Sequence, residues 1–379
     1  MAQSLTFEAP LAATPAPLAK AGERRILALD GLRGLMTIFV LVSHFFGELP
    51  HGIRGTTVGW LAVNVFFVLS GFLIGRLILE RRHHANFFVV FYARRFFRLV
   101  PIYLALVILF WALIQHFDAP WVDADVQFPL WSYLTFTQTF FMVGHDHIGA
   151  HWIAPTWTLA VEEHFYLVAP ALIVFVPQRW LVRVLVCLGL AAVALRVGVF
   201  AFGIGTPIMA LSMLPFRADL LICGILAAIA YTHPGVNLAR MLPALRVAPI
   251  VALVIVFFLK LVDDDAFAIW NPLVLGIGAA CLILSIALGS PEAKRYESRT
   301  LRFFGDNGYV IYLIHLPLLG LAHGLVLGTR PDIATPAQWA VTLATIPVVV
   351  IFGRLVTKYA EEPLMRFGRT WRWSEERRV

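Results

Sequence analysis

The sequence predicts an all-α protein that crosses a membrane with about ten helices and has both termini in the cytoplasm. Of its 379 residues, 60% are hydrophobic and only 14% are charged, whereas an average soluble protein carries about 25% charged residues. A soluble domain this apolar would lack the polar surface that water requires, so a lipid bilayer is its natural solvent. Separate apolar runs, each close to the length of a spanning helix, give the number of helices.

A helix needs about 20 apolar residues to cross the hydrocarbon core. A further apolar stretch, residues 128–143, could form a re-entrant or interfacial helix, and it is the segment most able to change the count. We expect a disordered cytoplasmic tail of residues 1–23, a membrane domain of residues 24–366 and a basic cytoplasmic tail of residues 367–379. The predicted spans are residues 29–47, 58–79, 99–117, 156–176, 180–202, 211–231, 247–262, 270–288, 303–327 and 337–357.

The number of lysine and arginine residues alternates between high and low from one predicted connection to the next. If the N-terminus lies in the cytoplasm, the inner connections carry 23 of these 30 residues, and the outer ones carry only Arg54, Lys260 and Arg330. Such an excess on one side is typical of the cytoplasmic loops of membrane proteins. The alternation supports ten spans, and it explains the net charge of +7 as topology instead of nucleic-acid binding.

Neither the cysteines nor the histidines predict a metal site. Cys187, Cys223 and Cys281 lie in apolar runs, which argues against a disulfide framework or a cysteine-based zinc site. His147 and His151 are four residues apart in an outer loop, and this spacing suits two metal ligands on one helix face. Because no further motif surrounds this pair, a solvated loop explains it better.

Ionisable side chains recur inside the predicted spans, where they are costly and by default mark a functional site. With a rise of about 1.5 Å per residue, four different spans bring such groups to one layer, about 10 Å below the outer face of the membrane core. Residue counting places them at one depth but does not by itself bring them into contact. The layer contains His44, Glu162, Glu163, Arg217, Asp219 and His315.

His44 is the candidate catalytic base. It follows Arg33 by about three helical turns, so both side chains share a helix face, with Arg33 at the cytoplasmic edge. A neutral imidazole is a natural general base, and a carboxylate from Glu162 or Glu163 could orient it and stabilise its charged form. Such a pair would suit deprotonation of a sugar hydroxyl. The alternative is a structural histidine that bonds a backbone carbonyl.

A cluster of arginines is expected at the cytoplasmic side, where Arg33 meets Arg94, Arg95 and Arg98. Clustered guanidinium groups can bind phosphates through paired hydrogen bonds. They can also anchor a membrane protein to lipid headgroups. Taken alone, the residues favour the anchor.

The sequence resembles acyltransferase family 3, whose members are integral-membrane enzymes that move acyl groups onto exported carbohydrates and other acceptors. The most specific part of the resemblance is the segment LDGLRG at residues 29–34, with His44 at the family's spacing, in which ten residues separate it from Arg33. The resemblance covers essentially residues 26–366. Six further motifs follow in order, at residues 63–74, 91–103, 155–166, 216–219, 312–317 and 361–363.

The resemblance implies a protein of the bacterial inner membrane. Its donor would be an acyl-CoA, with acetyl-CoA favoured, taken from the cytoplasm. Arg33, Arg95 and Arg98 would then hold the CoA phosphates. His44 would be the catalytic histidine, with Glu162 and its neighbour Glu163 in the supporting acidic positions. The acceptor would be an exported or lipid-linked carbohydrate. Membrane lipid would be the other partner of the protein. The implied substrate-binding residues are Ser70, Trp157, Tyr166, Arg217, Asp219 and His315.

Three departures from the family pattern bear on acceptor fit more than on reaction type. Thr158 replaces a serine, His164 replaces a glutamine, and Gly308 replaces the serine before Tyr309. Two other functions stay open: the polar layer could be a proton relay or sugar path of a transporter, or the chain could be a non-catalytic partner in polysaccharide export. No inverted repeat of the transporter kind is evident. The oligomeric state is also open.

Overall fold

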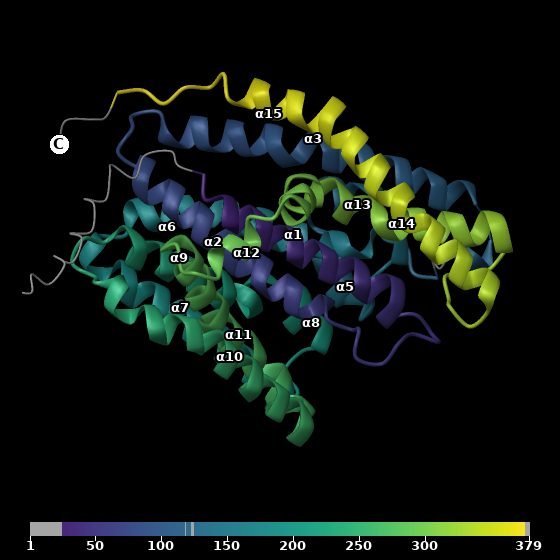
Figure 1. Cartoon of the computed structure of the whole chain (residues 1–379), viewed down its shortest axis with the longest axis horizontal. Helices are drawn as coiled ribbons and strands as arrows, with labels where there is room; N and C mark the ends of the chain where they lie inside the picture. The colour runs from purple at the N-terminus through teal and green to yellow at the C-terminus, as the bar shows by residue number, and fades with distance from the viewer. Residues whose placement is uncertain (1–24, 118, 123–124, 376–379) are drawn as a thin grey trace, which may run out of the picture.

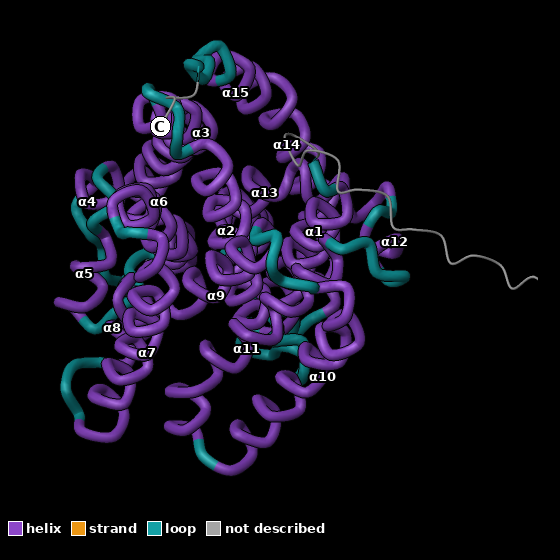
Figure 2. Tube along the Cα trace, turned by 90° about the vertical axis from the view of Figure 1, so that its left-hand side faces the viewer, coloured by secondary structure: helices purple, strands orange, loops and turns teal. Residues whose placement is uncertain are grey.

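The computed structural model describes residues 25–117, 119–122 and 125–375, and every regular element in these ranges is a helix (Figure 2). Ten of these helices are long and apolar enough to cross a membrane. This confirms the predicted all-α, polytopic fold. The predicted tail of residues 1–23 lies outside the described residues.

Each of the ten spans overlaps one predicted run. Four of them combine an α-helix with a second helical piece, either a π-turn, a 3-10 turn or a short α-helix. The spans are α1 with η1 (Leu27–Val42, Ser43–Gly47), α2 (Gly59–Arg81), α3 (Phe87–His116), η3 with α6 (His151–Thr156, Trp157–Phe175), α7 (Gln178–Phe202), α8 with α9 (Pro207–Ser212, Leu214–Thr232), α10 (Leu238–Val262), α11 (Asp264–Ala287), α13 (Arg299–Leu327) and α14 with η4 and α15 (Pro336–Val356, Thr357–Glu361, Glu362–Gly368).

The apolar stretch at residues 128–143 does not add a span. It forms two short helices, α4 (Leu130–Leu134) and α5 (Gln138–His145), within the connection between α3 and α6. Neither reaches the length of about 20 residues that a spanning helix needs. The remaining short helices are η2 (Pro120–Val122) and α12 (Ala293–Tyr296).

The third span begins earlier than predicted. α3 starts at Phe87, so the arginines expected in the connection before it lie inside the helix. Hydropathy sets a boundary at the first sustained apolar run, but arginine is also a good helix former, and a mixed segment can extend a spanning helix. Arg94, Arg95 and Arg98 are therefore held on a rigid element instead of a loop.

Part of the predicted C-terminal tail packs on the start of α3. The ring of Trp373 stacks on that of His84, with centroids 5.6 Å apart. Arg94 Nε donates to the carbonyl oxygen of Trp371 at 2.9 Å. Figure 1 shows α15 beside α3 at one edge of the molecule, with α10 and α11 at the opposite edge.

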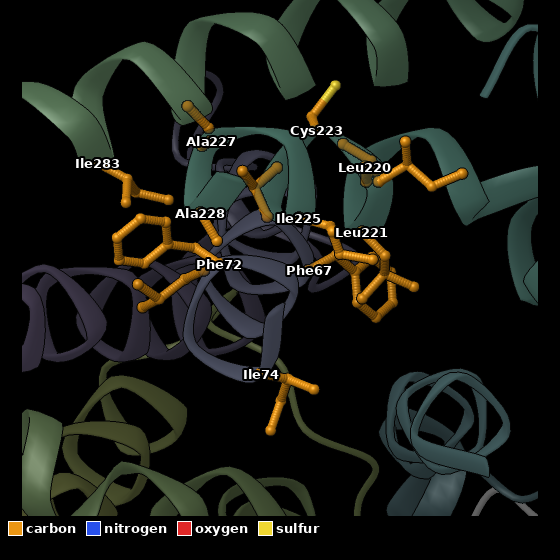
Figure 3. Close-up of a cluster of buried hydrophobic side chains, with 14 of the residues drawn as sticks. Phe67, Phe72, Ile74, Leu220, Leu221, Cys223, Ile225, Ala227, Ala228 and Ile283 are labelled. Atoms are coloured by element: carbon orange, nitrogen blue, oxygen red, sulfur yellow. The ribbon is translucent and has the colours of Figure 1, made fainter. Parts of the chain in front are cut away.

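The core of the bundle contains a close crossing of α2 and α9. A Cβ added at Gly71 would overlap the carbonyl oxygen of Leu221, and one at Gly224 would overlap that of Val68. Because lipid tails are as apolar as leucine, helices in membranes associate largely through such close backbone packing. Figure 3 shows the buried side chains around this crossing, among them Phe67, Phe72, Leu220, Leu221, Ile225 and Ala228.

A second close crossing joins α1 and α13. A Cβ at Gly34 would overlap the carbonyl oxygen of Leu301, and one at Gly305 would overlap that of Asp30. Ten residues further along each helix, His44 meets His315. Because the residue numbers increase by the same amount on both helices from the glycine contact to the histidine contact, α1 and α13 run parallel. The glycine contact therefore sets the register that brings the two histidines together.

The chain runs back and forth along the bundle from one span to the next, so the bundle has two ends (Figure 1). The Arg33 end contains the first turns of α1 and α3. The His44 end contains η1, η3 and the first turns of α2 and α11. Because the number of spans is even, both ends of the described chain lie at the Arg33 end. Which compartment that end faces stays a prediction.

Candidate active site

A π-helical turn, η1, carries His44 at the end of the first span. The backbone N–H of Glu48 donates to the carbonyl oxygen of Ser43 at 2.8 Å. Such turns insert one extra residue into a helix and occur often at functional sites. The Ser43 hydroxyl donates to Glu48 Oε1 at 2.7 Å, and Glu48 Oε2 is 3.4 Å from His44 Nε2. The turn therefore places a carboxylate beside the imidazole.

The imidazole of His44 is hydrogen-bonded to the imidazole of His315. His44 Nδ1 and His315 Nε2 are 2.7 Å apart, and His315 Nδ1 is 2.6 Å from the carbonyl oxygen of Tyr312. Because a carbonyl oxygen can only accept, Nδ1 of a neutral His315 carries the hydrogen, and its Nε2 accepts one from His44. Inferred in this way, the tautomer of His44 has its free lone pair on Nε2. That nitrogen can accept a proton.

A pocket of about 570 Å³ lies beside His44. Its walls come from η1, η3, and the first turns of α2, α6 and α11, so it lies at the His44 end. Its volume falls in the range of roughly 300–1,000 Å³ that is typical of ligand pockets. His44 keeps 17% of its side chain exposed, whereas His315 is fully buried behind it. The pocket is thus the natural place for a molecule that reacts at His44.

Two hydroxyl groups form part of the pocket wall. The Tyr312 hydroxyl donates to the carbonyl oxygen of Pro155 at 3.0 Å and is 2.9 Å from Thr158 Oγ1. Thr158 is one of the departures from the family pattern. Here it keeps the hydroxyl that a serine would supply, so the substitution preserves this hydrogen bond.

Arginine and asparagine side chains form another wall of the pocket. Arg217 Nη2 donates to Asn64 Oδ1 at 2.5 Å, and Asn64 Nδ2 donates to Asn271 Oδ1 at 3.2 Å. Arg196 holds both oxygens of Asp219, at 3.1 and 2.6 Å. Asp219 is 1% exposed and is not part of the pocket lining. Its predicted contact with substrate therefore has no support in this geometry, whereas Arg217 does line the pocket.

Glu162 belongs to a hydrogen-bond chain on the Arg33 side of the pocket. The Tyr166 hydroxyl donates to Glu162 Oε2 at 3.0 Å, and the Ser70 hydroxyl is 2.5 Å from that of Tyr166. The guanidinium of Arg95 lies over the Tyr166 ring, 3.9 Å from its centroid. Glu163 lies within electrostatic reach of Arg95. The chain therefore connects the paired glutamates to the arginines.

The predicted arginine cluster is present at the Arg33 end. Arg98 lies within electrostatic reach of both Arg33 and Arg95. Arg98 is exposed, and Arg95 Nε has no hydrogen-bond partner among the described residues. The buried carboxylate of Glu361, in the second π-turn η4, also faces Arg98. Arg33 Nη1 also donates to Asp30 Oδ1 at 3.2 Å. The cluster thus contains carboxylates as well, but the unpartnered Nε of Arg95 leaves it a donor for an anionic group.

The structure divides the predicted site residues between two places. The expected contact of His44 with Glu162 or Glu163 is not found in the described part of the chain, because His44 pairs with His315 and Glu48. Tyr312 lies within electrostatic reach of both Glu48 and Glu162. His44, Trp157 and Arg217 line the pocket, and His315 is buried behind His44. Toward the Arg33 end lie Arg33, Arg95, Arg98, Ser70, Glu162, Glu163 and Tyr166.

Sequence reasoning missed three polar residues of the pocket. Glu48 lies just beyond the predicted first span, residues 29–47, although it completes the turn around His44. Asn64 and Asn271 are uncharged, so a search for ionisable residues inside spans passes over them. The signal for both was a lone amide in an otherwise apolar run, since a buried amide needs partners.

No group of three or more His, Cys, Asp or Glu side chains that could hold a metal ion occurs in the described residues. His147 Nδ1 accepts a hydrogen bond from the backbone of Gly149 at 3.0 Å, whereas His151 lines the pocket. The predicted loop pair is therefore split between two environments.

The fold and the site define a polytopic membrane protein with a histidine-containing pocket between its helices. The sequence profile of the acyltransferase domain matches residues 26–354. The chain belongs to the acyltransferase 3 family. No solved structure matches this chain.

The curated relatives are O-acetyltransferases by name. The peptidoglycan O-acetyltransferase OatA of Listeria monocytogenes is 25% identical over 364 residues, which make up 90% of this chain and 56% of the relative. The O-acetyltransferase OatA of Staphylococcus aureus is 26% identical over 372 residues, 91% of this chain and 58% of the relative. A putative O-acetyltransferase of Staphylococcus aureus strain COL is 22% identical over 369 residues. The chain thus spans little more than half the length of these relatives.

Proposed function

We propose that the chain is an O-acyltransferase that moves an acetyl group from cytoplasmic acetyl-CoA to a hydroxyl of an exported or lipid-linked carbohydrate. The observation that carries the proposal is the imidazole of His44, whose Nε2 has a free lone pair at a pocket of about 570 Å³. A cluster of arginines lies at the opposite end of the bundle. An enzyme that joins a phosphate-bearing donor to an alcohol across a membrane needs both features.

The donor would bind at the Arg33 end. Guanidinium groups match the geometry of phosphate oxygens and form paired, charge-assisted hydrogen bonds with them. Arg33 and Arg95 repel Arg98, against the attraction of Glu361, and the CoA phosphates would add further counter-charge. The thioester arm would then extend past Tyr166 toward the pocket.

The acceptor would bind in the pocket with one hydroxyl at His44. His44 Nε2 takes the hydroxyl proton while the oxygen attacks the thioester carbonyl carbon. The resulting tetrahedral intermediate collapses, the carbon–sulfur bond breaks, and the leaving thiolate takes the proton from His44. An acetyl ester and free CoA thiol are formed. Transient transfer of the acetyl group to His44 Nε2 is the second possible route.

Three groups would support His44 during this reaction. His315 fixes its tautomer through Nδ1, and Glu48, 3.4 Å from Nε2, stabilises the imidazolium that forms. Glu162 acts from a distance, because its hydrogen bond goes to Tyr166. We propose that Glu162 and Glu163 set the charge of the path between the arginines and the pocket.

The proposed setting is a bacterial inner membrane with the Arg33 end in the cytoplasm. Acetyl-CoA is a cytoplasmic metabolite, and the excess of Lys and Arg at that end agrees with the positive-inside rule. The relative from Listeria monocytogenes is named a peptidoglycan O-acetyltransferase, which supports a cell-wall or other exported carbohydrate as the acceptor class.

A thiol-release assay tests this proposal. The purified protein would be placed in lipid nanodiscs with acetyl-CoA and a soluble peptidoglycan disaccharide. We expect free thiol and acetylated sugar in equal amounts, without any ion gradient. No thiol release, together with gradient-driven sugar uptake in proteoliposomes, would instead establish a transporter.

A further inference from the structure

One wall of the pocket carries a positive charge that no carboxylate balances. The wall contains two guanidinium groups, those of Arg196 and Arg217, and both residues line the pocket. One carboxylate, that of Asp219, is buried behind this wall and does not line the pocket. Both oxygens of Asp219 are bound by Arg196, in a pair that is almost fully buried. The charge of Arg196 is thereby matched, and that of Arg217 is not.

Arg217 is buried and incompletely bonded. It is 8% exposed, and its Nη2 donates to the neutral amide oxygen of Asn64. Its Nε is buried and has no hydrogen-bond partner within the part of the chain that the structure describes. The charged groups that act on it are Arg196, of the same sign, and Asp219. A buried cation in a membrane is costly unless a counter-charge is present.

The amides around Arg217 fix its position and leave its charge unchanged. Asn64 accepts from Arg217 and donates to Asn271, whose Nδ2 donates in turn to the carbonyl oxygen of Phe267 at 2.9 Å. Each amide is therefore held in one orientation. The arrangement is a rigid guanidinium in the wall of the pocket, with its Nη2 held by Asn64 and its charge unmatched.

A carboxylate lines another part of the pocket. Glu48 lines it beside His44 and is held by Ser43. An anionic group in the pocket would be repelled by Glu48 and attracted by Arg217. A ligand with its charge at Arg217 would thus extend its uncharged part toward His44.

We propose that Arg217, with Asn64, forms a subsite for an anionic group, a carboxylate or a phosphate, on the acceptor carbohydrate. The proposal rests on the proposed function and names the class of its acceptor. A guanidinium recognises the planar oxygens of a carboxylate and the oxygens of a phosphate through paired hydrogen bonds. The subsite would orient the sugar so that a hydroxyl, and not its charged group, meets His44.

Direct binding tests this subsite without catalysis. The protein in nanodiscs, without acetyl-CoA, is titrated with a trisaccharide of glucuronic acid and with its methyl ester. A second pair, glucose 1-phosphate and glucose, distinguishes phosphate from carboxylate. We expect at least one anionic probe to bind about tenfold more tightly than its neutral counterpart, which corresponds to about 1.4 kcal/mol. Equal binding within both pairs, or no binding of either anion, would overturn the proposal.

Two variants assign the preference to Arg217. Arg217→Lys keeps the charge and should retain part of the preference, whereas Arg217→Gln should bind each anion and its neutral counterpart equally. Thermal unfolding of the nanodisc-bound variants verifies that they fold. A full preference in Arg217→Gln would contradict the assignment. Since the readout is binding, failure of this proposal is distinguishable from failure of thiol release, which tests the proposed function.

Discussion

His44 Nδ1 lies 2.7 Å from His315 Nε2, and this contact joins two helices that run parallel. Gly34 and Gly305 permit the close crossing ten residues before the histidines on α1 and α13. The carbonyl oxygen of Tyr312 accepts from the far nitrogen of His315. A backbone carbonyl, a buried imidazole and a pocket imidazole thus form one chain that determines which nitrogen of His44 faces a substrate.

The first prediction concerns His315 as a positioning residue. His315→Leu removes the acceptor for His44 Nδ1–H, so we expect kcat to fall about 100-fold or more, in line with the usual contribution of a positioned base. The KM for acetyl-CoA should change little. His315→Gln, which can still accept through its side-chain oxygen, should recover part of kcat. Equal losses in both variants would indicate a packing role instead.

The second prediction concerns the helix crossing that sets the register. Gly34→Val would place a side chain against the carbonyl oxygen of Leu301, so α1 and α13 must separate. We expect a loss of stability of about 1–3 kcal/mol, typical of overpacking, and loss of activity. Gly144→Ala is the matched control, because a Cβ there has nothing within 4 Å. Thermal unfolding of both variants in detergent gives the comparison.

The third prediction concerns the arginine cluster. Arg95→Ala should raise the KM for acetyl-CoA about 10-fold to 100-fold, as expected for loss of a charged hydrogen bond, with a smaller change in kcat. The wild type should prefer acetyl-CoA to acetyl-dephospho-CoA, and a variant that has lost the phosphate contact should not. Arg299→Ala, at an exposed position of the same end, is the control. An unchanged KM in Arg95→Ala would exclude this donor site.

The fourth prediction concerns the buried ion pair of Arg196 and Asp219. Asp219→Asn leaves two guanidinium groups without any carboxylate, and breaking a buried pair from one side costs about 3–5 kcal/mol. The double variant Arg196→Met/Asp219→Leu replaces both charges with apolar groups, so it should unfold at a temperature much closer to that of the wild type. If the double variant is no more stable than Asp219→Asn, the pair contributes something other than charge balance.

The spans were predictable because their signal is local. Apolar runs and the alternation of arginines set the ten helices. The boundaries misplaced most are the start of α3, the start of α10 at Leu238 and the end of the last span at Gly368, because mixed segments such as Phe87–Arg98 carry no hydropathy signal. The arginine cluster was predictable for the same reason, as three of its members lie in two short motifs. Depth along a helix is also local, so His44 and His315 were correctly expected at one level.

The partners of each side chain were not predictable in this way. Contact depends on the rotation of each helix and on which helices are neighbours. The α1–α13 crossing decides that His44 meets His315, and not Glu162, whereas the π-turn brings Glu48 to the same imidazole. Neither the crossing nor the turn follows from the periodicity of the first span.

The account depends most on His44 as the group that takes the acceptor proton. The direct measurement is thiol release from acetyl-CoA by purified His44→Ala in nanodiscs, with His233→Ala, an exposed histidine in a connection, as the matched control. We predict that His44→Ala folds, binds acetyl-CoA and releases no thiol above background, while His233→Ala matches the wild type. Turnover by His44→Ala near the wild-type rate would contradict the account.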